Sequence, residues 1–106
     1  MATTVYRSRL RTGWIVQCDA SPPFRIDYAN LATVHGHCRD RLGTIAPALI
    51  ALSPEWVARE GEIPLVIDDI RRSSPPDEVL LGLSNDSWTT VPLSLIQALI
   101  DLSVSD

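Results

Sequence analysis

The alternation of apolar and polar residues between positions 6 and 67 constrains this chain more than any other feature of its sequence. Residues 6–10, 14–18 and 24–28 alternate as half-buried strands do. A longer stretch with helical spacing follows, and residues 63–67 form a fourth strand-like stretch. The order strand-strand-strand-helix-strand predicts an α+β fold, in which an antiparallel sheet of three to four strands carries one long helix.

The helical stretch has a single apolar stripe. Its members recur at steps of three and four residues: Leu31, Val34, Cys38, Leu42, Ile45 and Leu49. Asn30 is the expected N-cap, and Gly43 and Pro47 predict that the helix bends or breaks between them. Residues 53–59, where a serine precedes a proline, predict a second, short helical turn.

The sequence after residue 70 predicts a small appendage to a module of residues 1–70. Residues 71–78 are polar and contain two prolines, which indicates a linker. Residues 79–106 predict a hairpin, with strands at 79–83 and 88–91, followed by a helix that Pro92 opens. The helix carries an apolar stripe that we expect either to pack on the module or to form a homodimer interface: Leu95, Ile96, Leu99 and Ile100.

Length and composition favour one soluble core. The chain has 106 residues, of which 45% are hydrophobic, enough for one domain and too few for two ordinary ones. No stretch approaches the roughly 20 apolar residues that span a bilayer, and the N-terminal residues do not resemble a signal peptide. We therefore expect no membrane association and a cytoplasmic location. In that setting Cys18 and Cys38 are expected to be free thiols.

Charge is distributed unevenly along the chain. Up to residue 41, six arginines face three aspartates, a balance of +3, and beyond it three arginines face ten acids, a balance of −7. An acidic surface of this kind suits a basic partner. The predicted partner-binding residues are Glu60, Glu62, Asp68, Asp69, Asp77 and Glu78. A solvated surface without any partner is the simpler alternative.

The first strand predicts a second type of surface. Side chains alternate across a sheet, so the arginines of residues 5–11 share one face. They are Arg7, Arg9 and Arg11. This arginine-bearing strand could bind nucleic-acid phosphates, or it could simply protect an exposed strand from aggregation. The tryptophans at positions 14, 56 and 88 are expected in the core or at an interface, where an exposed one would be a binding hot spot.

The pattern of the first two-thirds of the chain resembles the HicB-like antitoxin family. The residues that carry the likeness are those of 13–16, 22–24, 31–34, 38–42 and Ile45. The resemblance implies a partly degraded RNase-H-like module that neutralises a small RNA-cleaving toxin. In the family a C-terminal segment binds the operator, but this chain has no basic residue after Arg72 with which to contact phosphates. Ala29-Asn30 also replaces the family's glycine-threonine turn.

Motifs for catalysis or metal binding are weak. His35 and Cys38 could face one ion with Cys18, but a core cysteine beside exposed histidines is the simpler interpretation. An RNase-H-like sheet could gather carboxylates around two magnesium ions, the candidates being Asp19, Asp27, Asp68 and Asp69, although solvation explains them more simply. No nucleophile elbow is present. We therefore expect no enzyme activity, no cofactor and no metal.

The predicted function is binding. The leading hypothesis is an antitoxin-like or regulatory protein whose acidic portion occludes a basic protein partner that acts on nucleic acids. One alternative is a phage or mobile-element inhibitor of a host defence protein, which would share the small size and acidity. Another is a nucleic-acid-binding regulator that uses the arginine-bearing strand.

Overall fold

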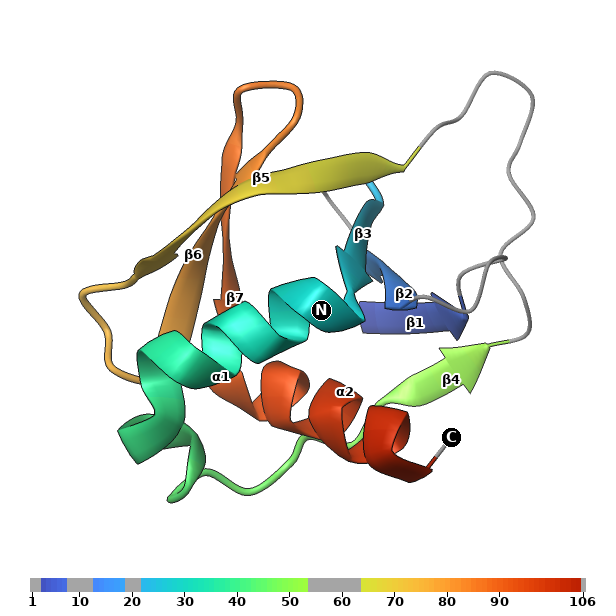
Figure 1. Cartoon of the computed structure of the whole chain (residues 1–106). Helices are drawn as coiled ribbons and strands as arrows, with labels where there is room; N and C mark the ends of the chain where they lie inside the picture. The colour runs from blue at the N-terminus through green and yellow to red at the C-terminus, as the bar shows by residue number, and fades with distance from the viewer. Residues whose placement is uncertain (1–2, 8–12, 19–21, 54–63, 106) are drawn as a thin grey trace.

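The chain folds as an α+β protein, as predicted. The computed structural model describes residues 3–7, 13–18, 22–53 and 64–105 (Figure 1). The strands are β1 (Thr3–Arg7), β2 (Gly13–Cys18), β3 (Phe24–Asp27), β4 (Ala51–Ser53), β5 (Leu65–Arg72), β6 (Glu78–Leu83) and β7 (Trp88–Pro92). The helices are α1 (Tyr28–Leu42) and α2 (Leu93–Ser105). The predicted helical turn at 53–59 and the start of the strand predicted at 63–67 lie outside the described residues.

The described strands form one mixed, curled sheet in the order β4-β1-β2-β3-β5-β6-β7. Strands β1, β2 and β3 are successive antiparallel neighbours, as are β5, β6 and β7. Two parallel contacts, β1 with β4 and β3 with β5, make the sheet mixed. The C-terminal hairpin thus extends the sheet that had been expected to hold three or four strands, because β6 pairs with β5 along almost its whole length.

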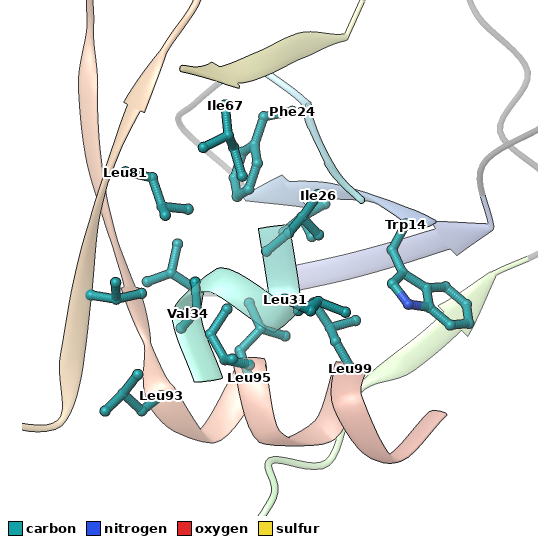
Figure 2. Close-up of a cluster of buried hydrophobic side chains, with 14 of the residues drawn as sticks. Trp14, Phe24, Ile26, Leu31, Val34, Ile67, Leu81, Leu93, Leu95 and Leu99 are labelled. Carbon is teal, nitrogen blue, oxygen red and sulfur yellow. The ribbon is translucent and has the colours of Figure 1, made fainter. Parts of the chain in front are cut away.

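The helices α1 and α2 lie side by side across one face of this sheet (Figure 1). The strand residues of the core cluster alternate in sequence, as the pleat requires, and point toward the helices, whereas Ile15 of β2 is buried outside that cluster. Figure 2 shows how side chains from both ends of the chain meet there, including Phe24 and Ile67 from strands and Val34 and Leu99 from helices. The N-terminal module and the C-terminal hairpin and helix therefore share one core.

The N-cap of helix α1 lies three residues earlier than predicted. Its N-cap is Asp27, whose backbone N–H donates to Oδ1 of Asn30 at 2.9 Å, so Asn30 occupies the third helical position. The buried stripe holds four of the predicted residues, Leu31, Val34, Cys38 and Leu42. The helix ends at Leu42, as the glycine and proline that follow predicted, and Leu49 is fully exposed beyond it.

Helix α2 packs its apolar stripe into the core. Leu95, Ile96 and Leu99 are buried within their own chain, at exposed fractions of 5%, 0% and 0%. These three side chains thus pack on the module, one of the two predicted alternatives, and leave almost no surface for the predicted homodimer interface. Ile100 is partly buried and packs against the same cluster.

A hydrogen-bond chain also joins the two ends of the protein. The indole Nε1–H of buried Trp14 donates to Ser103 Oγ at 3.1 Å, and this hydroxyl donates to the carbonyl oxygen of Leu99 at 2.7 Å. Because a buried indole N–H needs an acceptor, α2 completes the environment of a β2 side chain.

Strand β5 is longer than predicted and contains a bulge. It continues through Arg72, and β6 begins at Glu78, so the linker expected at 71–78 is reduced to residues 73–77. Ile67 pairs with Leu83 whereas Asp69 pairs with Gly82, which leaves one extra residue, Asp68, on β5. A bulge of this kind bends the strand and re-aims its side chains.

Candidate partner-binding site

The predicted acidic residues have different environments. Glu60 and Glu62 lie outside the described residues. Asp69 is occupied within its own strand, because Oδ1 accepts the backbone N–H of Ile70 and Oδ2 pairs with Arg71 Nε, both at 2.9 Å. The charge of Asp69 is therefore paired within its own strand, although its side chain stays 45% exposed.

Asp77 and Glu78 flank the start of β6. The backbone carbonyl of Asp77 accepts the N–H of Leu93 at 2.8 Å, which ties this loop to the start of α2, while the Asp77 side chain is exposed. Glu78 is half-buried opposite Pro92. Neither carboxylate has an ion pair within the described part of the chain.

Asp68 lines a polar cavity between β5 and α1. The cavity has a volume of about 290 Å³, and the helix contributes Asn30, Thr33 and His37 to its wall. The carboxylate of Asp68 is exposed and has no hydrogen-bond or ion-pair partner among the described residues. We call this cavity the Asp68 pocket. It is where the structure brings a predicted partner-binding carboxylate together with polar groups of another element.

The opposite face of β5, β6 and β7 carries an exposed tryptophan. Trp88 is 49% exposed, and its ring lies directly over Gly82, the residue that pairs with it on β6. The guanidinium of Arg71 lies 5.1 Å from the centre of the Trp88 ring, and the same guanidinium pairs with Asp69. Because the residues that alternate with the buried ones point away from both helices, this face is open in the described structure. Of the two tryptophans that the structure describes, Trp14 is buried and Trp88 is exposed.

Most of the described arginines are engaged within the chain. Besides Arg71, the engaged side chains are Arg25 with Asp27 at 3.1 Å, Arg72 with Asp40 at 3.4 Å, and Arg41 with the carbonyl oxygen of Pro76 at 2.8 Å. Arg39 is exposed on α1. The cations are thus largely committed, whereas several carboxylates of the C-terminal part are not.

Of the three arginines of the predicted arginine-bearing strand, the structure describes Arg7. Arg7 shares the helix-covered side of β1 with buried Val5, because Val5 pairs with Val16 and Arg7 pairs with Trp14. Its guanidinium lies 5.4 Å from the centre of the Trp14 ring. Arg9 and Arg11 lie outside the described residues. The described member of the three arginines therefore lies over a core tryptophan.

The described residues provide no geometric support for a metal site or a nuclease site. Cys38 is a buried free thiol, whereas His35 lies at the surface, on the rim of a cavity of about 310 Å³ between α1 and α2. Asp27 is the N-cap of α1 and pairs with Arg25. Within the described residues no group of three histidine, cysteine or acidic side chains could hold a metal ion. The same part of the chain contains no helix long and apolar enough to cross a membrane.

Two features of this site were not visible in the sequence. The bulge at Asp68 depends on how β5 pairs with β6, and nothing in the local sequence marks the extra residue. The approach of Asn30, Thr33 and His37 to Asp68 depends on the packing of α1 against β5. Gly82 opposite Trp88 is a signal that could have been used, because a glycine in a strand often marks a close approach.

Comparisons of this chain with protein-family models, with curated proteins and with solved structures found no match.

Proposed function

We propose that this protein acts by binding and not by catalysis, as an antitoxin-like or regulatory protein that occludes a basic, nucleic-acid-acting protein partner. The supporting observation is the imbalance of available charge in residues 64–105. This segment holds six carboxylates and two arginines, and both arginines are already paired with carboxylates of the chain. Among the predicted partner-binding residues, Asp68, Asp77 and Glu78 have no ion pair in the described structure.

Uncompensated carboxylates act on a basic partner in two ways. They accelerate its diffusional approach, and they favour the orientation in which opposite charges face each other. The resemblance of the first two-thirds of the chain to HicB-like antitoxins is compatible with this role. Such a partner would use its basic surface to hold nucleic acid, so covering that surface would also inhibit it.

Trp88 would add an apolar contact with the partner to the electrostatic attraction. Tryptophan and arginine are the residue types most enriched among interface hot spots, and Trp88 and Arg71 are stacked on an exposed face. Stacking on Gly82 restrains the indole before binding, so less conformational entropy is lost in the complex.

The test is capture from the native host with an affinity-tagged chain, followed by mass spectrometry before and after nuclease treatment. We expect a small basic protein that stays bound after nuclease, and a Trp88→Ala variant that retains at least tenfold less of it, since hot-spot truncations cost about 2 kcal/mol or more. The matched control is Thr90→Ala, on the same face of the same strand.

Other outcomes separate the alternatives. A large defence complex in place of a small basic protein would favour inhibition of host defence. Recovery of nucleic acid alone, lost after nuclease treatment, would refute the proposal and favour the regulator that contacts phosphates through arginine. Equal capture by the Trp88→Ala and Thr90→Ala variants would remove Trp88 from the interface.

A further inference from the structure

The Asp68 pocket contains a carboxylate that the fold leaves uncompensated. The two neighbouring aspartates of β5 differ sharply, because Asp69 has both oxygens occupied by Ile70 and Arg71 whereas Asp68 contacts no donor in the described structure. The bulge makes this difference, since it lets consecutive residues of one strand face different surroundings. Both aspartates line the pocket, but Asp69 is paired with Arg71, whereas the Asp68 carboxylate has no partner in the described structure.

The wall of the pocket offers further hydrogen-bond acceptors. Thr33 Oγ1 donates its proton to the carbonyl oxygen of Ala29 at 3.0 Å, which leaves its lone pairs available. His37, also in the wall, is exposed, and the described structure provides no partner for its ring nitrogens. The pocket therefore combines one negative charge with several acceptors from a second element.

The pocket is large enough to admit a side-chain group. Its volume of about 290 Å³ compares with the roughly 30 Å³ that one water molecule occupies in the liquid. A guanidinium matches this chemistry best, because it presents five N–H donors in a rigid plane and can bind a carboxylate with two of them while others reach neighbouring oxygens. An ammonium carries the same charge on a smaller, more strongly hydrated group with three donors.

We propose that the Asp68 pocket binds the guanidinium of an arginine presented by the basic protein partner. This inference rests on the proposed function in assigning that arginine to a protein. It goes further in naming the contact: Asp68 receives the guanidinium, and Thr33 and His37 accept from its remaining N–H groups. The exposed Trp88 on the opposite face of the sheet would form a separate contact.

The test is an NMR titration of the full chain with N-acetyl-arginine-amide as the probe. We expect saturable shifts of the backbone amide signals of Asn30, Thr33, His37 and Asp68. N-acetyl-citrulline-amide has nearly the same shape without the charge, and we expect no binding from it. The Asp68→Asn variant should weaken binding of the arginine probe at least tenfold, since hydrogen bonds between charged groups are the stronger ones.

The matched control is Asp86→Asn. It removes the same charge from another exposed aspartate, and asparagine tolerates the left-handed backbone of this position, where φ is 64°. We expect this variant to bind the arginine probe as the wild-type protein does. Equal losses in both variants would reduce the effect to net charge and overturn the inference.

Three further results would also overturn the inference: equal binding of arginine and citrulline probes, shifts confined to residues outside the pocket, or shifts of pocket residues produced by Mg²⁺ and not by the arginine probe. The outcome is separable from that of the capture experiment. Capture of a basic partner that the Asp68→Asn variant retains fully would refute the pocket and leave the proposed function standing. Binding of the probe without any basic partner would do the reverse.

Discussion

Replacing Leu99 with alanine tests whether α2 belongs to the core of a single chain. The Leu99 side chain is 0% exposed and lies in the cluster that joins both helices to the sheet. Truncation removes three carbon atoms, each worth about 0.8 kcal/mol of transfer free energy, and leaves a cavity that raises the cost further. We expect the free energy of unfolding to fall by about 3 to 5 kcal/mol.

A change on the exposed side of the same helix provides the comparison. Val104 is 83% exposed. Val104→Ala removes two carbon atoms that are mostly solvated already, so the expected loss is about 0.3 kcal/mol when scaled by the buried fraction. The two truncations should therefore differ about tenfold in their effect on stability.

The assay is urea unfolding followed by tryptophan fluorescence, at two protein concentrations that differ about a hundredfold. For a single-chain core, the midpoint should not depend on concentration, whereas a dimer held by α2 would become more stable as concentration rises. The slope against urea should be the same in both variants. A loss below about 1 kcal/mol for Leu99→Ala, or a wild-type midpoint that rises with concentration, would refute the assignment of Leu99 to the core.

Three further substitutions test other parts of the structure. Ser103→Ala leaves the buried Trp14 N–H without its acceptor, and calorimetry should show about 1 to 3 kcal/mol less stability. Gly13→Ala places a Cβ against the backbone of β3, which cannot move aside as a side chain can, so circular dichroism should show a largely unfolded chain, and a native spectrum would contradict this close approach. Gly82→Ala puts a Cβ 3.1 Å from the Trp88 ring. The indole must then shift, and a Trp88 fluorescence spectrum unchanged from wild type would count against the stacking.

Most elements were predictable from local patterns, and the two errors occur where an element depends on the position of another strand. Strand β2 and the buried stripe of α1 follow from alternation and from three- and four-residue spacing, which depend only on backbone geometry. The N-cap of α1 was misplaced because Asp27 and Asn30 are both good caps, and the choice depends on where β3 ends. Strand β4 was missed because its three residues are held by pairing with a distant strand, β1.

The acidic character of the C-terminal part could be predicted from composition. Which of its carboxylates are paired within the chain could not. Asp68 and Asp69 are adjacent and chemically identical, so no sequence argument ranks one above the other. The bulge in β5 separates them, because it is set by the register between β5 and β6. The Arg71 guanidinium pairs with Asp69 and leaves Asp68 without an ion pair in the described structure.

The α+β class, most of the elements, the apolar stripes of both helices and the negative balance after residue 41 follow from residue type and near-neighbour spacing. What each stripe covers depends on contacts between distant parts of the chain. The apolar stripe of α2 would have the same spacing if it packed against a second chain. In this structure it packs against its own sheet, because the pairing of β6 with β5 places α2 on the core. Trp88 is exposed beside Gly82 because β7 pairs with β6 in this register, and the periodicity of neither strand encodes that pairing.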